Sequence, residues 1–595
     1  TLFRSNSIAC INKLCVILKD TATMKVKLNN KYISILYWTF LMAVTFSCSK
    51  SFLEEKPLAL IAPDNLYVNK AGFESGLYGL YSQWREERKG INGASNDMAI
   101  TAAVIGVDNA YSLRPAGNAP EQVFNDFGVR LNSTDAYVRR VWDWLYRIIN
   151  GANTIIDRAD NASIVWSDKD KKQIVGEARL IRAWAYRHLT FLYGNVPLNI
   201  KESKGSSIKT DWERTPVTEV RKAMEADLLF AEANMSDLPV VEGRASKVVA
   251  QHYLAELYLT MGDFAKAREK ALAVTQNTNY SLTTARYGTQ ASMPGTPFTD
   301  MFLDRNSNRS QGNREALWVI QNEYLSVGGD ANIMRRWWVN RYNDIRVGNP
   351  LRNPLTFSQE YGGRGLGRFA VTKFALSLYG PTDHRGGNFS YRFFYLMNNA
   401  ASLPSNANIN LAATCATPGY TSGPSGGRLG VDTIRLSINC NEPAPNATAA
   451  PNWPSIRKWD WAPGDTADVQ NSSNYNDQIY LRLADTYLLL AEAQFRLNDL
   501  AGAAATINLI RARANATPIT ASQVTLDFIL DERSRELISE EHRRYTLLRT
   551  GTWFTRTQLN NKYAGTKIVL RDTLLPIPQS ELNSNTLIPA NNPGW

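Results

Sequence analysis

The sequence predicts a mostly α-helical protein, in which a scaffold of helical hairpins carries a large irregular, loop-rich insertion with short strands. Three observations predict this fold class. Several long segments place apolar residues at the period of a helix, and two of those segments resemble each other. Between about residues 277 and 476 the helical period fades in a stretch rich in Gly, Pro, Asn and aromatic residues.

The N-terminus is predicted to be an export and lipid-anchoring signal. Residues 1–23 precede the first methionine and are interpreted as non-native upstream translation. Residues 24–47 contain three lysines and then an apolar run, 32–46, that is shorter than the ~20 residues of a membrane-spanning helix. The run ends at Ser47-Cys48, which resembles a bacterial lipobox, so Cys48 is the predicted lipid attachment site. An ordinary signal peptide with an incidental cysteine is the alternative.

Helices are predicted over residues 64–88, 137–159, 169–193 and 215–235, each from its apolar periodicity. The third is expected to stop at Gly194 and Pro197. The fourth has Thr215 as a candidate cap, Pro216 at its start and Glu219 placed to complete a capping box.

Residues 254–271 and 490–507 form an internal repeat. Both begin Leu-Ala-Glu, both have an Asp in the turn, Asp263 or Asp499, and two alanines recur at the same offsets. Small residues at fixed offsets let two antiparallel helices approach closely, as in a tetratricopeptide-like hairpin. Residues 178–193 look like the first half of another hairpin. Two ordinary helical hairpins remain the alternative.

The stretch between these repeats is too long to be a single loop. Residues 316–324 and 368–376 read as short strands within it. We therefore divide the chain into three parts: a helical scaffold of about 64–276 and 477–557, an irregular region of about 277–476 that is expected to bind ligand, and a C-terminal tail of about 558–595.

Composition argues against several classes of protein. The net charge is +11, but removing residues 1–47 leaves 60 basic against 54 acidic side chains, with no basic stripe for a nucleic acid. Four His and five Cys are too few and too scattered for a zinc or iron–sulfur centre. The Gly-rich run 363–367 lacks phosphate-loop spacing and is predicted to be a plain loop. We expect no catalysis, cofactor or metal.

Cys415 and Cys440 are the cysteines left once the N-terminal ones are set aside. In an exported protein they are predicted to form a disulfide, which would contribute about 3 kcal/mol by restricting the unfolded chain. Two free thiols are the alternative.

Six segments together resemble the SusD/RagB family of outer-membrane lipoproteins of Bacteroidetes. They are the stem 48–57, the helical segments 177–198, 477–499, 507–513 and 531–551, and the tail 574–595, which ends Asn-Pro-Gly-Trp. The fifth departs from the family pattern at Glu541, where Gly is usual, and at Thr546, where Asp is usual.

The resemblance implies a protein anchored by lipid to the outer membrane and facing outward. It would bind oligosaccharides and act as the lid of a SusC-like TonB-dependent transporter. A peptide-binding lid of the RagB type and a helical scaffold without a small ligand are the alternatives. The charged residues of the fifth segment are expected to form ion pairs along one helix that hold the fold: Glu532, Arg533, Glu536, Glu540 and Arg544.

Sugar binding requires flat aromatic faces beside hydrogen-bonding groups. Three clusters in this sequence supply them, and the predicted carbohydrate-binding residues are Trp337, Trp338, Arg341 and Tyr342; Asp108, Asn109 and Tyr111; and Trp461, near Trp453 and Trp459. The alternative for each tryptophan is a place in the core or in a partner interface.

Overall fold

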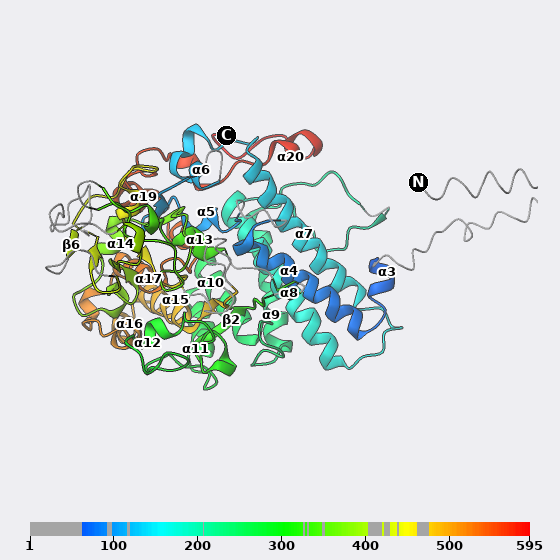
Figure 1. Cartoon of the computed structure of the whole chain (residues 1–595). Coiled ribbons are helices and arrows are strands. Elements are labelled where there is room, and N and C mark those ends of the chain that lie inside the picture. The colour runs from blue at the N-terminus through cyan, green and yellow to red at the C-terminus, as the bar shows by residue number, and fades with distance from the viewer. Residues whose placement is uncertain are drawn as a thin grey trace, which may run out of the picture. The chain divides into compact units, whose positions relative to one another are not determined.

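A computed structural model describes most of the chain after residue 61 (Figure 1). The described residues are 62–91, 98–115, 120–205, 208–324, 326, 328–329, 333–347, 351–402, 419–421, 429–436, 439–460 and 475–595. The leader, Cys48, Cys415 and Trp461 lie outside them, so what we predict for those residues stays a prediction. In the part of the chain that the structure describes, no helix has the length and apolarity needed to cross a bilayer.

The long helices follow the apolar periodicity, and the mostly α prediction is confirmed. They are α4 (Lys70–Lys89), α7 (Ala136–Arg158), α8 (Asp168–Tyr193) and α9 (Val217–Asn234), which lie together in Figure 1. A separate turn, α3 (Pro63–Leu66), precedes α4, so the single helix predicted over 64–88 is wrong. The Asn69 side chain accepts the Gly72 N–H at 2.9 Å and thereby starts a new helix.

The predicted capping box of α9 is also wrong. The Val217 N–H donates to the side chain of Asn195 at 2.9 Å, while the Thr215 N–H donates to the Val196 carbonyl. A residue from the preceding loop therefore caps the helix. The carboxylate that was expected to complete the box, Glu219, instead accepts from Lys222 one turn along α9.

The internal repeat folds into two matching helical hairpins. One joins α10 (Lys247–Met261) to α11 (Phe264–Thr275), and the other joins α15 (Leu483–Arg496) to α16 (Leu500–Arg513). Each turn has a residue with positive φ, Gly262 at 82° or Asn498 at 61°. The aspartate that follows then caps the second helix: Asp263 accepts from the Lys266 N–H and Asp499 from the Gly502 N–H. Helix α11 packs on α15, so the hairpins stack.

Shorter elements fill the rest of the fold. The helices are α5 (Thr101–Val104), α6 (Pro120–Asp126), α12 (Pro297–Asp300), α13 (Met334–Trp338), α14 (Lys373–Ser377), α17 (Leu526–Leu537), α18 (Arg543–Arg549), α19 (Trp553–Asn560) and α20 (Gln579–Ser584). Three antiparallel strand pairs join β1 (Ala110–Ser112) to β3 (Phe369–Val371), β2 (Ala316–Ile320) to β9 (Gln478–Arg482), and β4 (Tyr391–Arg392) to β8 (Ser455–Ile456). In a fourth sheet β7 (Thr433–Arg435) lies between β5 (Phe394–Leu396) and β6 (Gly419–Thr421).

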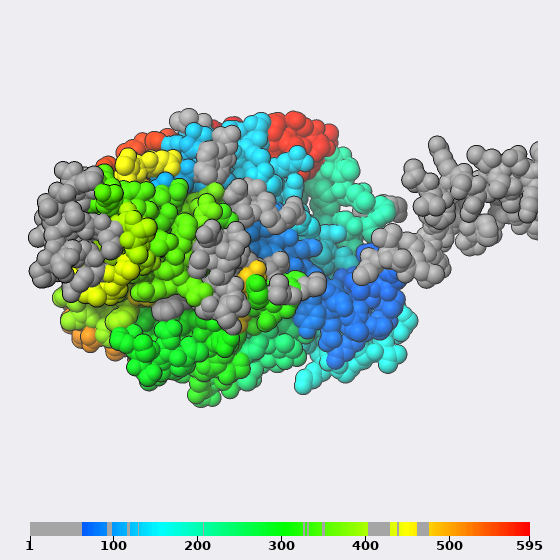
Figure 2. Space-filling model, in the orientation of Figure 1, coloured from blue at the N-terminus to red at the C-terminus, as the bar shows by residue number. Residues whose placement is uncertain are grey.

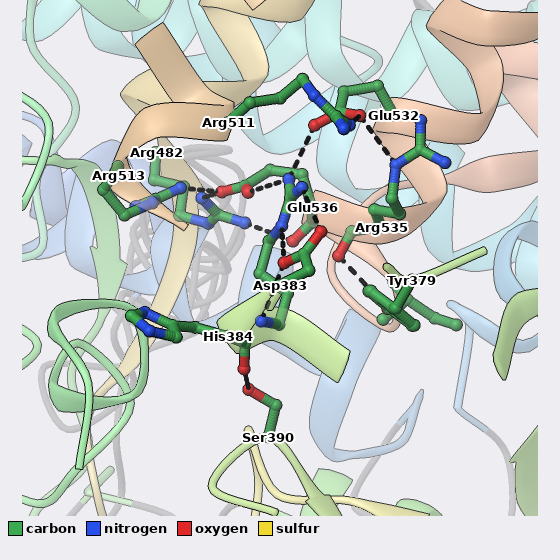
Figure 3. Close-up of polar contacts among 12 residues, drawn as sticks. Tyr379, Asp383, His384, Ser390, Arg482, Arg511, Arg513, Glu532, Arg535 and Glu536 are labelled. Carbon is green, nitrogen blue, oxygen red and sulfur yellow. Dashed lines mark hydrogen bonds and ion pairs between the residues drawn. The ribbon is translucent and has the colours of Figure 1, made fainter. Parts of the chain in front are cut away.

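A buried network of arginines and glutamates ties the irregular region to the hairpins (Figure 3). Glu536 of α17 pairs with Arg482 of β9, with Arg513 of α16 and, at 3.0 Å, with Arg385. Glu540 accepts from Arg482 at 2.7 Å. Of the five charged residues, Glu532 does pair along α17, with Arg535 at 2.7 Å. Glu536 and Glu540 are buried and take their partners from other elements, so the expectation of ion pairs along one helix is wrong for these two.

The two departures from the family pattern contact each other. Thr546 donates its hydroxyl to Glu541 at 3.1 Å, and Glu541 also pairs with Arg533 at 2.9 Å and Arg543 at 3.1 Å. The Glu541 carboxylate thus pairs with Arg533 and Arg543, while position 546 carries a threonine in place of the usual aspartate.

The buried pair of Glu256 and Arg187 predicts acid sensitivity. Burial by itself raises the pKa of Glu256, but the charge and hydrogen bond of Arg187, 2.5 Å away, together with the charges of Arg549 and His252, lower the pKa to about 2. Because the pKa of Glu256 is lower in the folded than in the unfolded chain, its ionised carboxylate stabilises the fold fully above pH ~4.5. This stabilisation is lost as the pH falls toward 2. We expect Glu256→Gln to cost on the order of 3 kcal/mol at pH 7 and much less at pH 3, measured by urea unfolding. An equal cost at both pH values would contradict this.

Candidate ligand-binding site

The predicted aromatic cluster around α13 lies in the core. Trp337 and Trp338 are 1% and 2% exposed, and both pack edge-on against Phe369, with ring centroids 4.7 and 5.3 Å away. Tyr342 is buried and stacks on Tyr395. Arg341 is the exception, since its side chain is 38% exposed and pairs with Asp344 at 2.9 Å.

The second predicted cluster is also internal. Asp108 accepts two hydrogen bonds from Arg543, at 2.8 and 2.7 Å, and one from Arg556 at 2.9 Å. Asn109 donates to Ser534 at 3.0 Å. The ring of Tyr111 stacks on Tyr563. These contacts join the loop before β1 to the C-terminal helices, which is a structural role.

Six of the eight predicted carbohydrate-binding side chains are therefore buried, and their placement does not support a ligand contact. Trp453 and Trp459 are buried as well, and Trp461 lies outside the described residues. Tryptophan content alone does not identify ligand contacts in this protein, because most of the described tryptophans fill the interior. Cys440 is disulfide-bonded, but its partner is not among the described residues, so the pairing with Cys415 stays a prediction.

The described surface does contain a hollow of about 1100 Å³ with aromatic walls. It lies between the first half of α7, the segment 197–212 and α20, and we call it the aromatic hollow. Figure 2 shows the C-terminal residues, in red, against the teal surface of the chain near residue 200. The lining residues are Trp142, Asp143, Tyr146, Arg147, Pro197, Asn199, Lys209, Thr210, Trp212, Glu581, Ser584 and Asn585.

Hydrogen bonds across the chain hold the walls of the aromatic hollow in place. The backbone of Trp212 makes two bonds with the Asn585 side chain, at 3.0 Å each. The Tyr146 hydroxyl donates to the Pro197 carbonyl at 2.8 Å, and Gln579 at the start of α20 is bonded to Ser133. Segments 373 and 446 residues apart in the sequence are thus joined, so the hollow is pre-formed.

The aromatic hollow combines ring faces with carboxylates. Trp212 is partly exposed, its indole N–H donates to the Lys209 carbonyl, and the Lys209 ammonium lies 4.6 Å from a ring centroid. Glu581 is partly buried and makes no hydrogen bond to another described side chain. Burial and the nearby negative charge of Asp143 raise the pKa of Glu581. Ring faces suit sugar C–H surfaces, and carboxylates accept bonds from hydroxyls.

A second hollow, of about 960 Å³, adjoins α14 and suits a sugar less well. It contains no tryptophan, and its carboxylate, Asp383, is fully engaged by Arg385 at 2.7 and 2.9 Å. The aromatic hollow is therefore the better candidate.

Sequence reasoning did not single out Trp212. The available signal was an isolated tryptophan among charged and polar residues, outside any helical period and next to Lys209, Asp211 and Glu213. Such a residue has no local apolar partners, which favours a surface position.

Known protein families and known proteins match this chain along most of its length. A family model described as the SusD family matches residues 314–595, and one described as starch-binding and associating with the outer membrane matches residues 111–259. SusD-like protein P25 of Formosa agariphila is 26% identical over 593 residues, covering 93% of this chain and 97% of that protein.

Two solved structures share the fold. A SusD homologue from Bacteroides thetaiotaomicron matches with a TM-score of 0.67 and 19% identity, covering 90% of this chain and 98% of that one. A laminarin-binding SusD-like protein matches with a TM-score of 0.61 and 21% identity, covering 89% and 100%. The order of motifs, the helical hairpins and both family models agree: this chain belongs to the SusD/RagB family.

Proposed function

We propose that this protein binds oligosaccharides at the cell surface and delivers them to a SusC-like TonB-dependent transporter, for which it acts as the lid. Lipid on Cys48 anchors it to the outer membrane, facing outward, and it performs no catalysis. The aromatic hollow carries the proposal, because it offers the ring of Trp212 and the carboxylate of Glu581, which pairs with no described side chain, at a pre-formed surface. The family membership, and the names of a laminarin-binding relative and of surface glycan-binding relatives, support it.

Trp212→Ala is expected to weaken oligosaccharide binding at least about tenfold, because aromatic anchors in such hollows contribute on the order of 2 kcal/mol. The protein from Ser49 onward is titrated by calorimetry with laminarin, starch and other plant, microbial and host polysaccharides, alongside a peptide pool. Trp166→Ala is the matched control, since Trp166 is also partly exposed but packs on Phe73 of α4.

The outcomes separate the alternatives. Binding to one glycan class that is lost in Trp212→Ala and kept in Trp166→Ala supports both the function and the site. Glycan binding unchanged in Trp212→Ala would keep the function and reject the aromatic hollow. Binding to peptides alone would make this a peptide-binding lid. No ligand at all, with co-purification of a transporter, would leave a scaffold protein.

A further inference from the structure

Positive charge is concentrated in one part of the irregular region. Residues 335–368 contain seven arginines and only two acids, Asp344 and Glu360, although the chain after the leader is nearly balanced. Two of these arginines, Arg364 and Arg368, lie near enough to a third, Arg336, for their like charges to act on it.

The Gly-rich loop 362–368 brings the three arginines together. The Leu366 N–H donates to the Arg336 carbonyl at 2.7 Å, and the Gly367 N–H donates to the Val339 carbonyl at 2.9 Å. A Cβ atom on Gly365 would lie 2.1 Å from the Val339 carbonyl oxygen, and Gly367 has a φ of +60°. Glycine at these positions therefore permits the close approach of the loop to the end of α13.

The charges of this arginine cluster are only partly neutralised. Arg368 lies 3.1 Å from the Glu121 carboxylate, and its guanidinium lies 4.9 Å from the ring centroid of Trp337. The Nε of Arg336 is buried and donates to no described residue. Arg364 is exposed and pairs with no described carboxylate. Burial, then repulsion by the neighbouring guanidinium groups, lowers the pKa of Arg336. An anion placed here would relieve that repulsion.

We propose that Arg336, Arg364 and Arg368 form a binding site for an anionic group, a carboxylate or a sulfate, carried by a saccharide ligand. Planar guanidinium groups bind both groups through paired, charge-assisted hydrogen bonds. The ring of the buried Trp337 packs against the Arg368 guanidinium, so Trp337 has a role in positioning Arg368. The proposal rests on the proposed function for the saccharide alone, since the arginine cluster shares no lining residue with the aromatic hollow.

The purified protein is titrated with a heparin-derived hexasaccharide, an oligogalacturonate and a neutral laminarin oligomer, at 0.05 and 0.5 M NaCl. We expect tighter binding of at least one anionic probe, weakened by salt, and a loss of about tenfold or more in Arg364→Gln and in Arg336→Gln. The two anionic probes distinguish sulfate from carboxylate. Arg268→Gln is the control, because Arg268 is an exposed arginine of α11.

Several results would overturn the proposal: no preference for either anionic probe, an Arg364→Gln protein that behaves like Arg268→Gln, or no effect of salt. Arg364 is exposed, so its variant keeps the test valid if Arg336→Gln fails to fold. If the protein binds laminarin in a way that depends on Trp212 but binds neither anionic probe, the arginine site is rejected and the proposed function still stands.

Discussion

Replacing Glu536 with Gln is expected to lower the free energy of unfolding by about 3–5 kcal/mol, because breaking a buried ion pair leaves its partners uncompensated. Glu536 is buried among the guanidinium groups of Arg385, Arg482 and Arg513, which come from three different segments. Figure 3 shows Arg482 and Arg513 beside it. Without the carboxylate these three cations repel one another in a space from which water is excluded. We expect the irregular region and the second hairpin to separate at lower denaturant.

Urea unfolding followed by tryptophan fluorescence measures the effect. Glu269→Gln is the matched control, since the Glu269 side chain is 68% exposed and pairs with Lys270 at the surface, and a change within ~0.5 kcal/mol is expected there. Burial alone would raise the pKa of Glu536, but the three arginines hold it below the usual range. Its contribution is therefore present above pH ~4.5 and falls with acid, so wild type and variant should converge at low pH. Equal midpoints for the two variants at pH 7 would reject this account.

Trp84→Ala is expected to lower the free energy of unfolding by about 3–5 kcal/mol, because of the cavity that the substitution leaves. Trp84 is 1% exposed and stacks on Trp318 of β2, with centroids 3.9 Å apart and ring planes at 8°. Its edge also meets Tyr480 of β9 at 4.7 Å. This aromatic cluster is where α4 packs on the strand pair that leads into the second hairpin.

Trp84→Phe is the conservative comparison, because a smaller ring still fills much of the site. The Trp84 indole N–H is buried without a described acceptor, so Phe also removes an unpaired donor. We expect Trp84→Phe to cost less than half as much as Trp84→Ala in the same unfolding assay. Similar losses for both variants would show that the stack contributes little.

The sequence predicted the hairpins well because their determinants are local. Apolar periodicity sets which face of a helix is buried, and a Gly or Asn followed by a capping Asp sets where one helix ends and the next begins. Gly262-Asp263 and Asn498-Asp499 carry that information within a few residues, and the structure uses both in the same way. The sequence did not predict the helix break at Asn69 or the cap from Asn195. Each depends on which of several nearby polar side chains accepts a hydrogen bond from a free backbone N–H, and the tertiary structure decides that.

The burial of the predicted site residues could not be read from the sequence, and the reason is again physical. A tryptophan is a possible sugar contact by its residue type, but whether its side chain is exposed depends on which distant segments of the chain cover it. Phe369 and Arg368 pack against the ring of Trp337, whereas the side chain of Asn585, some 370 residues away, fixes the backbone of the partly exposed Trp212. Similarly, seven arginines in one stretch are visible in the sequence, but their convergence requires the close approach that Gly365 allows.

By itself, then, the sequence determined the family, the helical hairpins and the irregular region between them, because motifs, periodicity and turn residues act over short distances. The tertiary structure alone decided which aromatic side chains are buried, how Glu536 gathers its arginines, and where surface hollows form. Those features arise from contacts between residues hundreds of positions apart, and no local pattern specifies which of many apolar or charged side chains will meet.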